Sequence, residues 1–200
     1  MSATSVNPLI AALHRQVRAV ASSASALTLW AAKFQSKIHA GWRPPTEAQA
    51  KTGDYPKAAL VVAGLPIVVE TPAWTFRAGK GQDGKEWITR NWADYGYIPR
   101  TDGGDGEGLD VYVMPGGVDE AARVYIVRQR DPRTGQHDED KVMLGFPTKA
   151  AAVLGYLVHY DRPEYFGGIT SMPMAEFKAF LVAGMQQWNA KAKYRKPHGQ

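Results

Sequence analysis

Four carboxylates lie close together in a glycine-rich segment of this chain. Asp102, Asp105, Glu107 and Asp110 follow one another within a short stretch, and only Arg100 carries a positive charge beside them. Like charges held this closely repel one another unless solvent or a cation screens them. Carboxylate oxygens are the ligands that hard divalent cations such as Mg²⁺, Mn²⁺ and Ca²⁺ prefer. The segment therefore predicts either a metal site or a solvated acidic loop.

A second polar group follows at Asp131 and in the run 138–141. Side chains alternate across a strand, so Glu139 and Lys141 are expected on one face, with Asp138 and Asp140 on the other. An acid and a base on one face suit a site that holds both a metal and an anion. Several further side chains could donate to phosphate oxygens, namely Arg77, Arg90, Tyr95 and Tyr160.

The elements that must position these residues are many short strands followed by helices. The residue pattern predicts strands over 60–62, 67–70, 75–77, 86–90, 109–113, 123–128 and 141–144. Helical spacing predicts one or two helices over 8–40 and others over 148–159 and 174–188. In the strand at 109–113, Asp110 and Tyr112 are expected to share the polar face. This pattern favours the α+β class, mainly β, as a small closed or curled β-barrel with flanking helices.

The chain is expected to divide into four segments. These are an N-terminal helical arm at 1–44, a linker or lead-in at 45–59, a main domain at 60–190 and a basic tail at 191–200. The pair Pro44–Pro45 ends the arm because two prolines stop a helix. The arm could pack on the domain or on a partner, bind a surface, stay disordered, or act as an organelle transit peptide, since it is amphipathic and free of acids.

Composition excludes several classes of protein. The chain has no cysteine, which excludes disulfides, thiolate nucleophiles and cysteine-bound zinc. It has no apolar run near the ~20 residues that span a bilayer and no secretory signal pattern, so we expect a cytoplasmic protein without a membrane span. The net charge of +5 comes from the two ends of the chain. Nucleic-acid binding is therefore expected only through those basic ends.

Other motifs for metal or nucleotide chemistry are missing. The acidic loop does not have the EF-hand spacing, and the chain contains no phosphate-binding loop and no Gly-x-Ser-x-Gly elbow. The five histidines show no metal-ligand spacing. The acidic loop faintly matches repeat-type calcium loops, but Gly108 stands where an Asp is needed and there is no second copy.

The run Tyr95-Gly-Tyr-Ile-Pro, followed by Asp105-Gly-Glu-Gly-Leu-Asp110-Val, resembles the signature of the family I soluble inorganic pyrophosphatases. That signature is Tyr-Gly-[Tyr/Phe]-Ile-Pro, a spacer, and Asp-Gly-Asp-Pro-[Leu/Val]-Asp-Val, and the spacing from the tyrosine to the acids agrees. The similarity continues in order over about residues 65–165. Residues 45–58 also look like the lead-in to pyrophosphatase-like domains of phages and mobile elements.

The resemblance implies an oligonucleotide-binding-fold-like barrel that hydrolyses pyrophosphate with Mg²⁺, for which Mn²⁺ could substitute. It implies Glu107 as the general base that deprotonates the attacking water. The implied metal ligands are Asp105, Asp110, Asp131 and Glu139, with Glu70 more peripheral. The implied phosphate contacts are Arg77, Arg90, Tyr95, Lys141 and Tyr160. A homo-oligomer, or a larger assembly through residues 1–44, is the expected quaternary arrangement, associated with a virion if a phage encodes the chain.

The chain departs from the family pattern at several positions. Glu107 is one methylene longer than the family's aspartate, Gly108 replaces a proline and loosens the turn, and Asp161 replaces a phosphate-binding lysine; Gly79 and Thr89 stand where the family tends to carry acids. These changes keep two other functions open. One is a non-catalytic module of the same fold that acts as a structural or virion-associated component through its arm. The other is a hydrolase of nucleotides or other phosphoesters.

Overall fold

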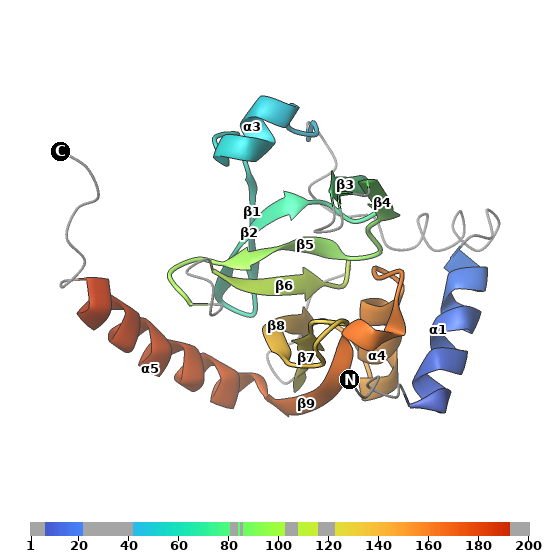
Figure 1. Cartoon of the computed structure of the whole chain (residues 1–200). Coiled ribbons are helices and arrows are strands. Elements are labelled where there is room, and N and C mark those ends of the chain that lie inside the picture. Colours follow the sequence, from blue (N-terminus) through green and yellow to red (C-terminus); the bar gives the residue numbers. More distant parts are fainter. Residues whose placement is uncertain are drawn as a thin grey trace.

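A computed structural model describes residues 7–21, 42–80, 84, 86–102, 108–115 and 123–192. Within these ranges the chain forms one large sheet, a separate hairpin and several helices (Figure 1). The strands are β1 (Ala58–Val62), β2 (Leu65–Thr71), β3 (Phe76–Lys80), β4 (Glu86–Arg90), β5 (Asp94–Ile98), β6 (Leu109–Val113), β7 (Arg123–Arg130), β8 (His137–Leu144) and β9 (Phe166–Pro173). The helices are α1 (Pro8–Ala21), α3 (Glu47–Thr52), α4 (Lys149–Leu157), the short 3₁₀ turn η1 (Pro163–Tyr165) and α5 (Met174–Ala192).

The large sheet is mixed and open. Its strand order is β1-β2-β5-β6-β8-β7-β9, and β6 with β8 is the parallel pair among otherwise antiparallel neighbours. The mainly β, α+β class is confirmed. A closed barrel is not found in the described part of the chain, because β1 and β9 lie at opposite edges and do not pair with each other. None of the described helices is long and apolar enough to cross a bilayer.

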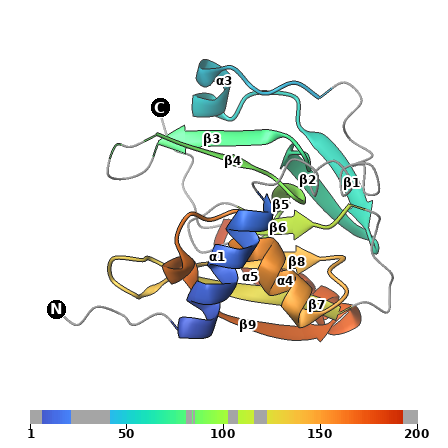
Figure 2. The same cartoon turned by 90° about the vertical axis from the view of Figure 1, so that its right-hand side faces the viewer.

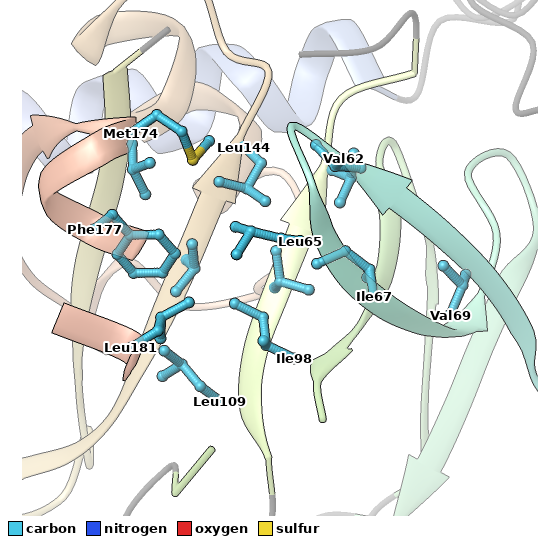
Figure 3. Packing of buried hydrophobic residues seen from close by; sticks show 14 residues of the cluster. Val62, Leu65, Ile67, Val69, Ile98, Leu109, Leu144, Met174, Phe177 and Leu181 are labelled. Carbon is cyan, nitrogen blue, oxygen red and sulfur yellow. The ribbon is translucent and has the colours of Figure 1, made fainter. Parts of the chain in front are cut away.

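Alternation along the central strands builds a separate core on each face of this sheet. Val111, Val142 and Leu144 join one core, whereas Tyr112 and Met143 join the other. Helix α5 packs on the first core (Figure 3), through Met174, Phe177 and Leu181. Helices α4 and α1 lie together at the second core (Figures 1 and 2). Polar residues that share a face with Tyr112 and Met143 are therefore presented on the α4 side.

Helix α1 packs on the domain itself. Its buried His14 donates from Nε2 to the carbonyl oxygen of Tyr160 at 2.8 Å, and Ile10 and Leu13 pack against the second core. Figure 2 shows α1 running across α4. The buried side of α1 is thus occupied by this chain's own domain, which is one of the arrangements expected for the arm.

Position 96 in β5 must be glycine because strand β2 lies too close for any side chain. A Cβ atom at this position would lie 1.9 Å from the carbonyl oxygen of Val68. This contact is with backbone, so no side chain can rotate to relieve it. Because Val68 pairs with Tyr97 in the same sheet, a substitution at Gly96 would push β2 away from β5.

Replacing Gly96 by alanine is expected to destabilise the fold by about 2 kcal/mol or more, as an overpacked core does. Gly184 in α5 offers a matched control, since a Cβ there would meet no atom within 4 Å. Gly184→Ala should be neutral or stabilise the protein by about 0.5–1 kcal/mol, because alanine is the better helix former. Urea unfolding of both variants measures the difference, and equal effects would contradict this packing.

Four elements lie where no regular structure was predicted, and one of them is the short turn η1. Helix α3 lies in the expected linker and begins with a capping box between Thr46 and Gln49. Strand β5 lies in the Tyr95 motif, and β9 lies at one edge of the sheet. The remaining strands and the helices α4 and α5 overlap the predicted ranges.

Candidate active site

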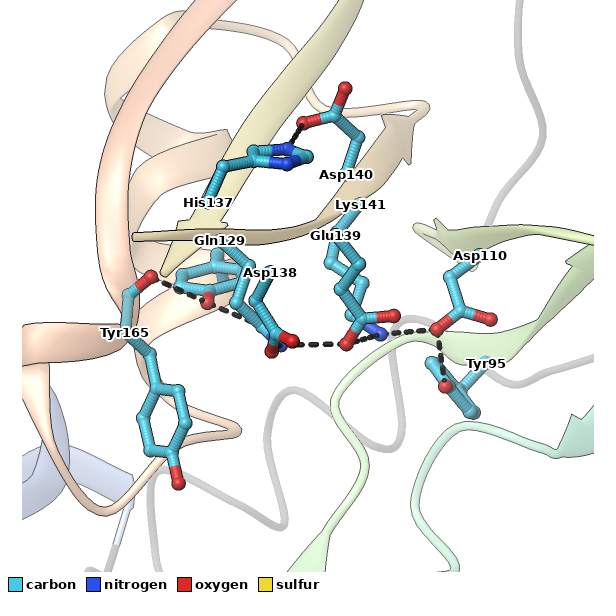
Figure 4. A network of polar contacts seen from close by, with 10 residues as sticks. Tyr95, Asp110, Gln129, His137, Asp138, Glu139, Asp140, Lys141 and Tyr165 are labelled. Atoms are coloured by element: carbon cyan, nitrogen blue, oxygen red, sulfur yellow. Dashed lines mark hydrogen bonds and ion pairs between the residues drawn. The ribbon is translucent and has the colours of Figure 1, made fainter. Parts of the chain in front are cut away.

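A continuous series of polar contacts runs across β5, β6, β8 and β7 on the α4 side of the sheet. We call it the polar chain, and its members in order are Tyr95, Asp110, Lys141, Glu139, Gln129 and Tyr156. Figure 4 draws these contacts, with Lys141 between two carboxylates. The polar chain brings together four of the residues that the sequence singled out, from strands that are far apart in the sequence.

Strand pairing explains why these residues meet. Tyr95 lies opposite Tyr112 in the β5–β6 pair, and its hydroxyl donates to Asp110 Oδ2 at 2.8 Å. Strand β8 runs parallel to β6, so Lys141 reaches the same Oδ2 atom. The Nζ atom of Lys141 also lies 2.7 Å from Oε1 of Glu139, which is two residues earlier on the same face of β8. The predicted shared face of Glu139 with Lys141, and of Asp110 with Tyr112, is confirmed.

Each carboxylate of the polar chain uses one oxygen for protein contacts. Asp110 engages Tyr95 and Lys141 through Oδ2, and Glu139 engages Lys141 and Gln129 through Oε1. Within the described ranges, Asp110 Oδ1 and Glu139 Oε2 have no protein partner and are not buried. Two accessible carboxylate oxygens are ligands that suit a hard divalent cation, whereas the ammonium beside them can only serve an anion. The residues therefore fit the expected metal.

Lys141 is a buried residue whose surroundings favour its charged form. The residue is only 3% exposed. Burial by itself lowers the pKa of this ammonium, but the nearby Tyr95, Asp110 and Glu139 outweigh that cost, so the pKa of Lys141 is raised. The ammonium is consequently held in its charged form at neutral pH.

For Glu139, in contrast, the surroundings favour the neutral form. Burial raises the pKa of its carboxyl above the ordinary 4.5, Lys141 partly reverses this, and Asp110 and Asp138 raise it again. A carboxylate with a raised pKa binds a proton more readily in the folded state than in the unfolded chain. Burial, together with the neighbouring acids Asp110 and Asp138, therefore outweighs the pairing with Lys141.

This raised pKa gives a testable pH dependence. As the pH rises above 4.5, the unfolded chain releases the Glu139 proton first, so the metal-free wild type should lose stability relative to Glu139→Gln. The loss should be complete once the pH exceeds the raised pKa. Added Mg²⁺ should reverse the difference, since a cation stabilises only the ionised carboxylate. Urea unfolding from pH 4 to pH 8 measures it, and a difference that does not vary with pH would contradict the raised pKa.

Gln129 is a site residue that the sequence did not indicate. It is buried on β7, and its Nε2 donates to Glu139 Oε1 at 2.6 Å and to Asp138 Oδ2 at 3.0 Å. The prediction that Asp138 lies on the opposite face from Glu139 is therefore wrong. The register of the β7–β8 pair shifts between Arg128 and Arg130. The single residue Gln129 therefore lies opposite two residues of β8, Asp138 and Glu139. Such a bulge re-aims side chains, and a regular alternation does not reveal it.

Tyr160 belongs to an aromatic wall beside the polar chain. Its ring stacks on Tyr156 with centroids 4.4 Å apart and lies 5.2 Å from Tyr165. Burial raises the pKa of the Tyr160 phenol well above its usual value, and Tyr112 adds to this. The phenol therefore stays protonated at neutral pH.

His159 lies next to this aromatic wall and is held by two hydrogen bonds. Its Nε2 accepts from the Trp92 backbone N–H at 2.9 Å, and its Nδ1 lies 2.6 Å from the carbonyl oxygen of Gly155. The first contact needs a bare nitrogen and the second needs an N–H, so the ring is the neutral Nδ1–H tautomer. The ring stacks on Tyr112. His159 therefore has a packing role in the second core.

Two predicted metal ligands have cationic partners of their own. Asp131 accepts from the Arg133 backbone N–H at 2.7 Å and from its guanidinium, and this bonding lowers the pKa of the Asp131 carboxyl. Glu70 pairs with Lys57 at 2.8 Å. The structure shows neither in contact with the polar chain, and both stay predictions as ligands.

The predicted arginines lie on the β3–β4 hairpin. The guanidinium of Arg90 lies 5.9 Å from the ring centre of Trp74 and 5.8 Å from that of Phe76, and its buried Nε has no hydrogen-bond partner in the described structure. Arg77 pairs with Thr89 through its backbone, and its side chain lies outside the described part. Within the described structure, the contacts of Arg90 are with Trp74 and Phe76 and not with the polar chain.

The acidic loop is only partly described. Asp105 and Glu107 lie outside the described residues, so their expected roles as ligand and base stay predictions. Among the described residues, no group of three or more histidines or carboxylates is placed to hold a metal. At Gly108 a Cβ would lie 2.6 Å from the ring of Tyr97. This tight packing explains the glycine where the signature has proline. The turn before Gly108 lies outside the described residues, so the expectation that Gly108 loosens it stays a prediction.

Comparison with known proteins gives the chain a family. The family model described as Inorganic Pyrophosphatase matches residues 47–182, which is more than half of the chain. A search of curated proteins found no match. The solved structures that are similar include an inorganic pyrophosphatase from Neisseria gonorrhoeae, with 19% identity, 62% of this chain and 91% of that chain covered, and a TM-score of 0.38. Another is an inorganic pyrophosphatase from Coxiella burnetii, with 14% identity, 61% and 93% covered, and a TM-score of 0.35. Because these scores and identities are low, the assignment depends on the family model.

Proposed function

This chain belongs to the inorganic pyrophosphatase family, and from that premise we propose that it hydrolyses inorganic pyrophosphate to two phosphates with Mg²⁺. The observation that carries the proposal is the polar chain, in which Asp110 and Glu139 flank the buried Lys141 and each keeps one oxygen accessible. This arrangement combines oxygen ligands for a cation with a fixed positive charge for an anion.

The proposed metal ligands are Asp110 and Glu139, joined by Asp105 and by Asp131 after it leaves Arg133. Glu70 would act further out, since Lys57 already neutralises it. A bound divalent cation would neutralise charge on pyrophosphate and lower the pKa of the attacking water.

The chain's own residues would orient the substrate and move the proton. Lys141 has three N–H donors. Asp110 and Glu139 each accept one of them, which leaves the third for a phosphate oxygen. The protonated Tyr160 would donate from the aromatic wall, with Tyr95, Arg77 and Arg90 as the remaining phosphate contacts. Glu107 would accept the proton from the attacking water.

Phosphate release by the purified full chain tests this proposal. With pyrophosphate and Mg²⁺, or with Mn²⁺ in its place, release should saturate with substrate and stop when EDTA removes the metal. Nucleoside triphosphates and a phosphomonoester should be poorer substrates. No release from pyrophosphate with either metal would refute the function, and faster release from a nucleotide would move the assignment to another phosphohydrolase.

A further inference from the structure

Gln129 lies at a point where both neighbouring strands are irregular. On the β8 side, Arg128 pairs with Asp140 and Arg130 pairs with His137, which leaves Gln129 opposite Asp138 and Glu139. On the β9 side, the register also shifts between Val127 and Gln129. Bulges of this kind recur next to active sites because they re-aim a side chain. Here they turn an amide side chain inward, among charged groups.

Every polar atom of the Gln129 side chain has a partner. The residue is 4% exposed. Its Nε2 donates to Glu139 Oε1 at 2.6 Å and to Asp138 Oδ2 at 3.0 Å, and its Oε1 accepts from the Tyr156 hydroxyl at 2.9 Å. Tyr156 is fully buried and stacks on Tyr160. The amide is consequently held from behind and cannot turn away without leaving a buried group unpaired.

The bond to Glu139 has a direction that matters for cation binding. Gln129 and Lys141 both approach the same oxygen, Oε1 of Glu139, from its two sides. In Figure 4 this oxygen points toward Gln129, and the second oxygen lies on the side of Asp110. An amide nitrogen can only donate, so it holds the carboxylate without adding charge. A carboxylate at this position would repel Glu139, and an apolar side chain would let it rotate.

We propose that Gln129 is a positioning residue of this site: by holding Glu139 through Oε1, it keeps Oε2 turned toward Asp110, where the two carboxylates can share a divalent cation. This role rests on the proposed function. Neighbours that orient a ligand in this way typically change metal affinity by about 10–100-fold when they are removed.

The test is a titration of the full chain with Mn²⁺ alone, followed by electron paramagnetic resonance and without pyrophosphate. Gln129→Met keeps the side-chain volume and removes both donors, so it should weaken Mn²⁺ binding by about tenfold or more and change the spectrum of the bound ion. Gln136→Met is the matched control, because Gln136 is exposed in the turn before β8. The control should bind Mn²⁺ like the wild type.

Tyr156→Phe provides a second, milder variant in case Gln129→Met does not fold. It keeps the ring and removes only the hydroxyl that anchors Gln129, and we expect Mn²⁺ binding about threefold weaker. If Gln129→Met folds and matches the wild type in Mn²⁺ affinity and spectrum, the role of Gln129 is overturned while the proposed function stands. If Gln129→Met does not fold, the same result for Tyr156→Phe overturns the role. Wild-type protein that binds no Mn²⁺ would overturn both.

Discussion

Replacing Asp110 by asparagine is expected to slow phosphate release from pyrophosphate about a hundredfold or more, with little change in the fold. The carboxylate of Asp110 is shared by Tyr95 and Lys141 through Oδ2, and its other oxygen is accessible to a cation. An amide has no charge to offer that cation, and one of its two polar atoms is a donor. The initial rate at saturating Mg²⁺ and a Mn²⁺ titration measure the loss.

The matched control for this variant is Asp54→Asn. Asp54 is exposed in the turn that follows α3, so the same chemical change there should leave the rate unaltered. Circular dichroism and urea unfolding should show that both variants keep the wild-type fold. If Asp110→Asn retains the wild-type rate and Mn²⁺ affinity, Asp110 is not a metal ligand.

Replacing Lys141 by methionine is expected to have the largest effect on stability. The side chain is 4% exposed and lies between Asp110 and Glu139. Methionine fills similar space but leaves two partly buried carboxylates without their cation, which costs about 3 kcal/mol or more when one partner of a buried ion pair is removed. The variant should also lose pyrophosphate hydrolysis, since the fixed positive charge of the site is gone.

The destabilisation in Lys141→Met should depend on charge. It should shrink below about pH 4, where carboxylates become protonated, and Mg²⁺ should restore more stability to the variant than to the wild type. Lys149→Met, at an exposed lysine at the start of α4, is the control and should change little. A loss in Lys141→Met that is the same at acidic and neutral pH, with or without Mg²⁺, would point to packing instead of charge.

The central strand of the site could be predicted well from the sequence. Strand β6 has the predicted bounds, and alternation correctly placed Asp110 with Tyr112. The reason is that β6 is regular and its neighbours β5 and β8 pair with it without a shift. Alternation also correctly placed Lys141 with Glu139. Where a strand is regular, a period of two carries the three-dimensional information.

The prediction failed where pairing is irregular. Strand β9 contains Gly167 and Gly168 and ends in proline, which are weak strand signals, and it is held as a strand by its pairing with β7. Strand β5 was not predicted for a similar reason. It contains Gly96, which is needed because the Val68 backbone lies close to it and which is a weak strand signal. Long-range pairing therefore decides these segments, and a short window of sequence does not contain it.

Gln129 shows the same limit for the site. Its sequence neighbours are Arg128 and Arg130, and neither composition nor spacing marks the residue as special. Its importance comes from the register shift that sets one residue opposite two. By contrast, Tyr95, Asp110, Glu139 and Lys141 could be selected because their residue types match a known motif in order.

The hydrolysis itself is tested most directly by measuring phosphate release from pyrophosphate with Mg²⁺ for the wild type and Asp110→Asn side by side, at equal protein concentration. We predict release by the wild type that increases in proportion to the amount of protein and is nearly absent in Asp110→Asn. Equal release by both proteins would show that the polar chain is not the site of the reaction. No release by the wild type would show that the fold is retained without the activity.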